Sequence, residues 1–429
     1  METKNQKSNV LAIIVMILLF GMISFVTNLA SPMGDILKNQ FSVANWMGTL
    51  GVLANFIAYA VMGIPAGNML QKMGYKKTAL IAVGVGFIGV AIQTLSGTIT
   101  SNAAFGVYLL GAFVAGFSMC MLNIVVNPML NKLGGGGNKG NQLIQIGGSF
   151  NSLMGTACIF LTGVLIPNGI KNAVISDVFP LMYLALGIFA LAFIVIFMTA
   201  IPENAPQAVV KEKSEIGPMS FRHFVLGAIA IFVYVGVEVG IPNVLQKWLQ
   251  NGGLTAESGA EAIAATVTAT YWFLMLVGRL GGAAIAAKVS AKSMLGAVSF
   301  IGLVLVLGAI FMNPETTVNL PVFRGTEGFG SALVPINAAL LVLCGLCTSV
   351  MWGGIFNLAV EGLGKHTEKA SGIFMALVCG GGVLPFIQGL VADAAGFINS
   401  YWVVIIGLGY MLFYALVGSK NVNKDIPVE

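Results

Sequence analysis

The chain has very few charged side chains for its length. Asp, Glu, Lys and Arg make up 9% of its 429 residues, whereas hydrophobic residues make up 57%. The mean hydropathy is +0.91. A soluble domain carries about 25% charged residues, and a protein this apolar has too little polar surface to cover itself in water. The scarcity of charge therefore excludes an ordinary soluble protein and indicates a chain whose solvent is largely lipid.

Residues that bind metals or nucleotides are also scarce. The chain has two histidines, His223 and His366, and both fall at the ends of predicted helices. The glycine run at 134–137 follows no predicted strand and lacks the Gly-Lys-Ser/Thr end of a phosphate-binding loop. Cys344 and Cys347 form a C-x-x-C without a second pair, which favours buried free thiols over a zinc or redox site. The sequence thus predicts no enzyme, no cofactor, no metal and no nucleic-acid partner.

What the chain has instead is twelve apolar segments, each close to the roughly 20 residues that a membrane helix needs. They begin near Val10, Ala44, Thr78, Ala103, Gln142 and Phe179, and near Phe221, Ala262, Ser293, Val334, Ser371 and Tyr401. A charged, proline-flanked stretch separates the two sets of six, as is typical of a linker. We therefore predict an N-terminal six-helix bundle at 1–202, a cytoplasmic linker at 203–220 and a C-terminal six-helix bundle at 221–429.

Positive charge is distributed unevenly between alternate loops. With the N-terminus in the cytoplasm, sixteen Lys and Arg residues fall on the cytoplasmic side and four on the other side. Loops rich in Lys and Arg stay in the cytoplasm, so the net charge of +5 is a topology signal. We predict that both termini are cytoplasmic. The short loops and the lack of an organelle address favour a bacterial inner membrane.

The two halves of the chain repeat one another. Gly63 and Gly67, followed by a lysine-rich turn, recur in the second half as Gly278 and Gly282 with two further lysines behind them. Six-helix repeats in parallel are how transporters of the major facilitator type are built, with the substrate site between the halves. The predicted fold class is an all-α membrane protein with twelve transmembrane helices in two pseudo-symmetric six-helix bundles, the major facilitator fold.

Longer motifs resemble those of a known family. They are Asn127-Pro128 with Leu133-Gly134, Phe150-Asn151-Ser152, Tyr234 with Glu238, Gly278-Arg279, and the runs at 355–367 and 380–393. On these motifs the chain resembles the fucose–galactose–glucose/proton symporter family of the major facilitator superfamily. The resemblance implies a monosaccharide of the glucose, galactose or fucose class as substrate, a proton as co-substrate, and a monomer in the lipid bilayer.

Two acidic residues of that family are replaced in this chain. The family has an aspartate before the proline of the first span and a glutamate four positions before the Asn-Pro of the fourth. This chain has Ser31 and Asn123 there. In the family these acids are implicated in proton coupling and sugar binding. The resemblance therefore supports a sugar site more strongly than proton symport. A facilitator, which lets the sugar move down its own gradient, remains an alternative.

A sugar in a membrane cavity needs neutral polar side chains, because each hydroxyl that loses water must regain a hydrogen bond. Asn and Gln offer both a donor and an acceptor, and an aromatic ring covers the apolar face of a sugar. The predicted substrate-binding residues are Asn28, Ser31, Asn123, Gln145, Asn151, Tyr234, Glu238, Tyr271, Trp272 and Trp352. Hydrogen bonds between helices use the same residue types, so a packing role is the alternative for each, and above all for Asn127 and Asn357.

Two charged residues fall inside predicted spans. Glu238 lies deep in the seventh span, where a carboxylate is costly and indicates function. It is the predicted proton-coupling residue, with a structural glutamate as the alternative. Arg279 in the eighth span and Glu361 are predicted to form a gate, because opposite charges that meet in one conformation bias alternating access. Binding of an anionic substrate is the alternative for Arg279.

Together these features predict secondary-active or facilitative transport of a monosaccharide by alternating access. An exporter of drugs or metabolites on the same fold is the alternative from another class. It would need an apolar, aromatic-rich cavity, which the many asparagines disfavour. A permease for another neutral polyol also fits the replaced acids.

Overall fold

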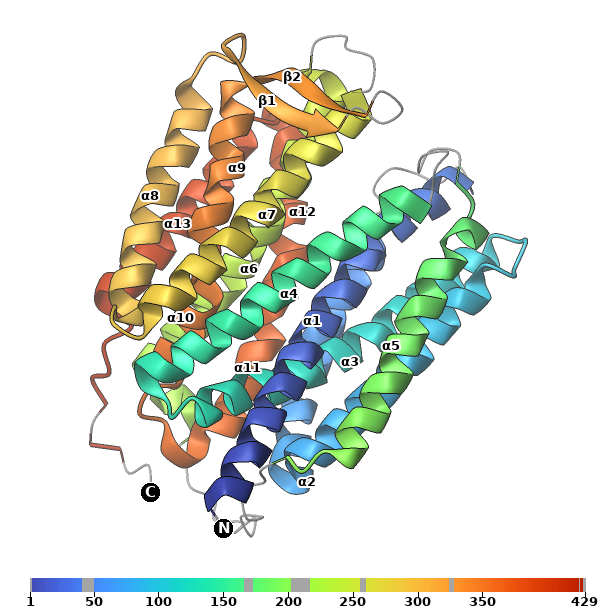
Figure 1. Cartoon of the computed structure of the whole chain (residues 1–429). Coiled ribbons are helices and arrows are strands. Elements are labelled where there is room, and N and C mark those ends of the chain that lie inside the picture. The colour runs from blue at the N-terminus through green and yellow to red at the C-terminus, as the bar shows by residue number, and fades with distance from the viewer. Residues whose placement is uncertain are drawn as a thin grey trace.

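The computed structural model describes residues 2–40, 50–165, 173–201, 217–254, 260–323, 328–423 and 425–426. Within these ranges the chain is almost entirely helical (Figure 1). The linker predicted at 203–220 lies outside the described residues up to residue 216, and its last three residues form the short helix η3 (Pro218–Ser220). The division into two bundles at this linker therefore stays a prediction.

The described residues of the first half form five long helices. They are α1 (Glu2–Gln40), α2 (Leu50–Ser96), α3 (Ala103–Leu133), α4 (Gly137–Leu165) and α5 (Phe179–Met198), with η2 (Ile175–Val178) before α5. The 47 residues of α2 would make a straight helix about 70 Å long, more than twice the hydrocarbon thickness of a bilayer. Gly74 breaks it with a φ of 79°, a conformation that favours glycine, so α2 supplies the second and third spans.

In the described part of the second half there are eight longer helices, two strands and several short helical turns. The helices are α6 (Arg222–Trp248), α7 (Ala260–Ala286), α8 (Ala291–Phe311), α9 (Ile336–Thr348), α10 (Met351–Val360), α11 (Thr367–Ala376), α12 (Gly380–Ala395) and α13 (Trp402–Phe413). The short turns are η4 (Leu249–Gly253), η6 (Gly364–His366), η7 (Leu377–Cys379), η8 (Asn399–Tyr401) and η9 (Tyr414–Gly418). A turn at Ser349 and Val350 joins α9 to α10 as the tenth span, and η7 joins α11 to α12 as the eleventh.

The twelve predicted spans are confirmed. Ten segments of the described residues are long and apolar enough to cross a membrane. The kinked α2 counts once among them but supplies two spans, and α4, which is more polar, is the remaining one. The chain is therefore a multi-pass membrane protein of the predicted all-α class.

One loop departs from that class. Between α8 and α9, the strands β1 (Thr317–Phe323) and β2 (Phe329–Pro335) pair as an antiparallel hairpin. Val322 of β1 and Ala332 and Val334 of β2 are buried. The tenth span, predicted from Val334, accordingly begins at Ile336.

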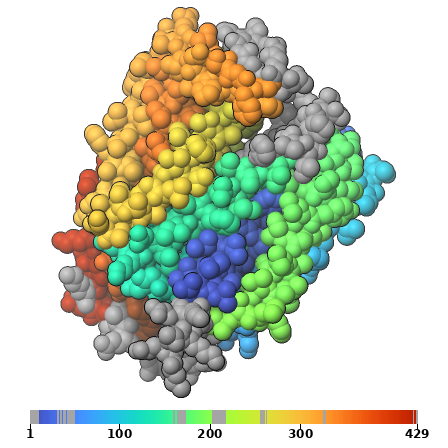
Figure 2. All heavy atoms as spheres, in the orientation of Figure 1, coloured from blue at the N-terminus to red at the C-terminus, as the bar shows by residue number. Residues whose placement is uncertain are grey.

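The helices form two groups that meet at one end of the molecule. Figure 1 shows α1–α5 beside α6–α13, with both chain termini at one end and the β1–β2 hairpin at the other. We call these the terminal end and the hairpin end. The two groups approach each other along α4 and α7 near the terminal end and diverge toward the hairpin end. Figure 2 shows the same face, with α4 between α7 and α1.

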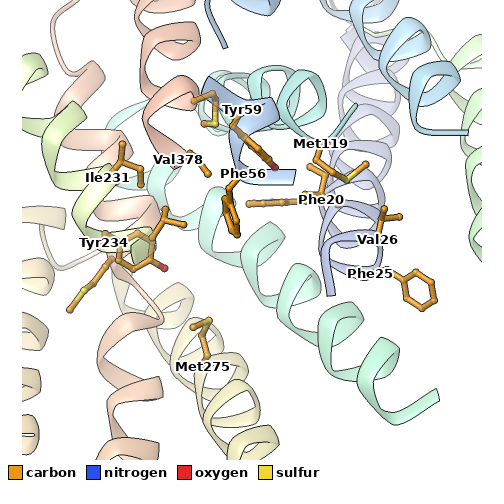
Figure 3. Packing of buried hydrophobic residues seen from close by; sticks show 14 of the residues in the cluster. Phe20, Phe25, Val26, Phe56, Tyr59, Met119, Ile231, Tyr234, Met275 and Val378 are labelled. Atoms are coloured by element: carbon orange, nitrogen blue, oxygen red, sulfur yellow. The ribbon is translucent and has the colours of Figure 1, made fainter. Parts of the chain in front are cut away.

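Apolar packing joins the two groups behind this contact. Phe56 of α2 lies between Phe20 of α1 and Val378 of η7 (Figure 3). A Cβ added at Gly381 would lie 2.6 Å from the Phe56 ring, so glycine at this position lets the ring pack directly on α12. The Phe56 ring thus packs across the interface between the two groups.

Glycines bring two backbones into contact across the interface. A Cβ added at Gly67 would lie 3.0 Å from the Gly372 Cα, and one added at Gly372 would lie 2.8 Å from the carbonyl oxygen of Gly63. Small residues spaced four apart allow this close approach of membrane helices. The repeated glycine motif of the first half therefore holds α2 against α11.

We expect Gly372→Trp to keep the terminal end open, because an indole has no room where α2 and α11 touch. The measurement is thiol labelling of Gln145→Cys, a position buried between the groups, in a chain whose five native cysteines are replaced by serine. Labelling should rise strongly when Gly372→Trp is added. Gly389→Trp is the matched control, since a Cβ there meets nothing within 4 Å. Equal labelling with the two tryptophans would contradict the expectation.

Candidate functional site

A buried arginine joins the two helix groups. Arg279 of α7 is 7% exposed, and its guanidinium reaches across to α4. Its Nη1 donates to the carbonyl oxygen of Gly148 at 2.8 Å, to Ser152 Oγ at 2.7 Å and to Asn151 Oδ1 at 3.2 Å. All three acceptors are neutral, and all three belong to the first half of the chain.

The remaining bonds of Arg279 stay within the second half. Its Nε donates to the carbonyl oxygen of Ser349 at 3.1 Å, where α9 ends and α10 begins. Its Nη2 forms an ion pair with Glu238 Oε1 on α6 at 3.2 Å, and the Glu238 side chain is 13% exposed. Each charge would be far more costly to bury alone than with the other. The pair is therefore what allows an arginine and a glutamate to lie inside the membrane.

Two tyrosines hold Glu238 in place. Tyr234 donates its hydroxyl to Glu238 Oε1 at 2.8 Å, and Tyr271 donates to the backbone carbonyl of Glu238 at 3.2 Å. The Tyr271 hydroxyl also lies 2.8 Å from Thr348 Oγ1. Both rings are fully buried. The carboxylate thus has a fixed orientation toward Arg279.

A second network consists only of neutral groups. Trp352 of α10 donates its indole N–H to Asn127 Oδ1 of α3 at 3.0 Å. Asn127 Nδ2 in turn donates to the backbone oxygen of Asn123 at 2.9 Å, and Asn123 Nδ2 donates to the Tyr59 hydroxyl at 2.9 Å. The Trp352 ring centroid lies 6.3 Å from that of Tyr234. Trp352 therefore connects the neutral network to the charged one.

Most predicted site residues meet at this interface. Those that form hydrogen bonds or ring contacts within the two networks are Asn123, Asn151, Tyr234, Glu238, Tyr271 and Trp352. Gln145 joins them from α4 and donates to the carbonyl oxygen of Val350 at 3.0 Å. Trp272 packs edge-on against Tyr271 with ring centroids 5.4 Å apart.

Two predicted residues lie on α1. Asn28 donates to the backbone oxygen of Ser24 at 2.8 Å on its own helix, and it borders α4 at Gly155. Ser31 lies further along α1, and its side chain is outside the described residues. Asn28 therefore lies between α1 and α4, within the first half. The role of Ser31 stays a prediction.

In this conformation Arg279 pairs with Glu238 and not with Glu361. The gate predicted for Arg279 and Glu361 therefore stays a prediction. Glu361 is exposed just beyond the end of α10. Its backbone oxygen lies 2.9 Å from His223 Nε2. A carboxylate at a helix end can remain in water, whereas Arg279 points inward and needs a counter-charge at its own depth. Glu238 provides that charge.

Several partners in these networks were missed by the sequence reasoning. Two of them, at Gly148 and Ser349, are backbone carbonyl oxygens, which leave no trace in residue type. Ser152 directly follows Asn151 in the family motif, so its neighbourhood was a usable signal. Tyr59 is a polar aromatic residue in the second span, and a search for such residues would have found it.

Comparison with known proteins gives the family. Residues 11–384 match the model of the Major Facilitator Superfamily. The chain is 30% identical over 425 residues to the "Glucose/galactose transporter" of Brucella abortus biovar 1 (strain 9-941), covering 98% of this chain and 97% of that one. It is 23% identical over 404 residues to the "L-fucose-proton symporter" of Escherichia coli (strain K12), covering 87% and 85%.

A solved structure shares the fold. The crystal structure of the Major Facilitator Superfamily transporter FucP in the outward conformation matches with a TM-score of 0.78 and 20% identity, covering 96% of this chain and all of that one. A match of this kind over whole chains agrees with the twelve spans and with the two groups seen in Figure 1. The chain therefore belongs to the major facilitator superfamily, in its fucose–galactose–glucose/proton symporter family, and is a transporter and not an enzyme.

Proposed function

We propose that the chain carries a monosaccharide of the glucose, galactose or fucose class across a bacterial inner membrane by alternating access. The observation that carries this proposal is the layer of neutral amides, tyrosines and tryptophan between the helix groups. Such groups match sugar hydroxyls as donors and acceptors, and an indole face suits the apolar face of a sugar ring. The names of the relatives support the same substrate class.

The arrangement of the two groups supports an outward-facing state. At the terminal end they are joined by the bonds of Arg279 to α4, by Gln145 to Val350, and by Trp352 to Asn127. They diverge toward the hairpin end (Figure 1). If the Lys and Arg distribution sets both termini in the cytoplasm, the hairpin end faces the outside. The similarity to a structure in the outward conformation agrees with this orientation.

We call the layer formed by Asn123, Asn151, Tyr234, Glu238 and Trp352 the central layer. The sugar would enter it from the hairpin end. Asn123, Asn151 and Glu238 supply acceptors there, and Trp352 supplies a ring. Asn151 uses its Nδ2 on the carbonyl oxygen of Phe20 at 2.7 Å, but an amide has a second N–H and a second lone pair for a hydroxyl. The further candidates are Asn28, Ser31, Gln145, Tyr234, Tyr271 and Trp272.

Arg279 would act as the gate of the terminal end. When the groups part there, it loses the three acceptors on α4 and keeps Glu238 and Ser349, which lie in its own half. A buried guanidinium without any counter-charge would make opening prohibitively costly. Glu238 therefore keeps Arg279 paired in both conformations, and the neutral α4 acceptors are the bonds that break.

Any proton coupling would act through Glu238. Ser31 and Asn123 stand where the family has acids. Among the described acidic side chains, Glu238 is the one held inside the layer between the groups. A proton on Glu238 would weaken its attraction to Arg279 and so change the balance between the two conformations.

Uptake of labelled glucose, galactose and fucose tests the proposed transport. Cells that express the chain should take up at least one of these sugars in a saturable manner, above cells with an empty vector. A protonophore separates the two energy sources, since it abolishes accumulation by a proton symporter and leaves entry through a facilitator intact. Uptake of none of the three sugars would contradict the proposed substrate class.

A double-variant cycle tests the ion pair. Arg279→Gln and Glu238→Gln should each lower the melting temperature of the purified protein, because each leaves one charge buried and unpaired. The double variant should lie closer to the parent, with a coupling energy on the order of 1–3 kcal/mol. Arg222→Gln, at an exposed position, is the control. Additive losses would mean that the two charges do not depend on each other.

The same double variant also tests proton coupling, because it removes Glu238 without leaving Arg279 buried and unpaired. If Glu238 mediates proton coupling, the double variant should exchange sugar in counterflow but should not accumulate it. Accumulation equal to that of the parent would remove Glu238 from the coupling mechanism.

A further inference from the structure

A band of carboxamides lies between the helix groups at the terminal end. It comprises Asn127 and Asn131 on α3, Asn141 and Gln145 on α4, and Asn357 on α10, and we call it the amide band. Members of one helix are four residues apart, which places them on one face. Members on α3 and α4 bond across the interface: Asn131 to Asn357 of α10 at 3.2 Å, and Gln145 to the carbonyl oxygen of Val350, just before α10, at 3.0 Å.

Asn141 is the exception within this band. It is 0% exposed, yet neither its Nδ2 nor its Oδ1 has a hydrogen-bond partner among the described residues. An unpaired buried amide costs roughly 1–3 kcal/mol. Packing alone gives no reason to keep a carboxamide there, because an apolar side chain of similar size would avoid this cost. The amide is therefore expected to have a partner in another conformation.

Gly353 of α10 brings the α4 carboxamides to one point. A Cβ added at Gly353 would lie 2.6 Å from Gln145 Nε2 and 3.0 Å from Asn141 Oδ1. Both amides therefore converge on the backbone of α10, directly beside Trp352. When α4 moves away from α10, both amides and the Trp352 ring would face the space that opens between them.

We propose that the amide band is a second binding site for the transported sugar, on the terminal side of the central layer, which forms only when the groups part at that end. This inference rests on the proposed function. In the present conformation the amides bind each other and the backbone across the interface. In the open conformation sugar hydroxyls replace those partners, and Asn141 gains the partner that it lacks here. Because all the exchanged bonds are between neutral groups, opening exposes no unpaired charge.

The test compares sugar binding in two forms of the purified chain. One form is the parent, and the other carries Gly372→Trp, which keeps the terminal end open; Gly67→Trp, on the other side of the same contact, replaces it if that chain does not fold. The probe is whichever of labelled glucose, galactose or fucose the uptake assay selects. Asn141→Ala should weaken binding to the open form about three- to tenfold, the effect of one neutral hydrogen bond. Binding to the parent should not change.

Asn55→Ala is the matched control. Asn55 is also a buried asparagine with an unpartnered Oδ1, but it packs against Gly116 within the first half. It should leave binding unchanged in both forms. The melting temperature gives a second readout, because Asn141→Ala should not destabilise the parent if Asn141 has no partner there.

Three results would overturn the inference, and one of them would also overturn the proposed function. Unchanged sugar binding in the open form would mean that Asn141 has only a packing role. Equal weakening in both forms would mean that Asn141 acts on the central layer or on the fold as a whole. Absence of sugar binding in every form, the parent included, would overturn the proposed function and this inference with it.

Discussion

The structure depends on how one buried guanidinium is satisfied. A buried guanidinium without partners is costly, so Arg279 needs acceptors in every conformation that the protein visits. The chain divides them into two sets. Glu238 and Ser349 move with Arg279, while Gly148, Asn151 and Ser152 belong to the opposing helix. The first set keeps the charge compensated, and the second makes the closed state of the terminal end more stable without making its opening prohibitive.

The neutral groups around this charge follow a related logic. A substrate made of hydroxyls can replace an amide–amide bond at little cost, because it offers the same donors and acceptors. The bonds of Trp352 to Asn127 and of Asn131 to Asn357 are of this replaceable kind. Glycine contacts between α2 and α11 complete the closed end without adding any bond that must be broken. The closed end is thus held by many weak interactions and one compensated charge.

The sequence allowed the fold to be predicted almost completely, because hydrophobic length and loop charge act locally and can be counted. The types of residue at the site were also predictable, since a membrane interior makes each Asn, Glu or Arg conspicuous. Their pairing was not. Glu361 was the predicted gate partner of Arg279, whereas in this conformation Arg279 pairs with Glu238. Backbone acceptors such as the Gly148 carbonyl, and the pairing of residues 317–323 with 329–335, arise from three-dimensional placement that residue types do not encode.

The replaced acids and the ion pair together constrain the energetics of transport. Ser31 and Asn123 stand in the first half where the family has acids, and Glu238 and Arg279 form an ion pair between the groups whose net charge is zero. A neutral sugar bound beside this pair adds no net charge. The membrane potential should therefore have little effect on the conformational change of the loaded carrier. Coupling to a proton would require Glu238 to release Arg279, which leaves a buried cation to be compensated by α4 or by the substrate. Within the proposed mechanism, the strength of this one ion pair therefore determines whether transport can be coupled to a proton. The neutral groups around the pair determine how often the terminal end opens and exposes it.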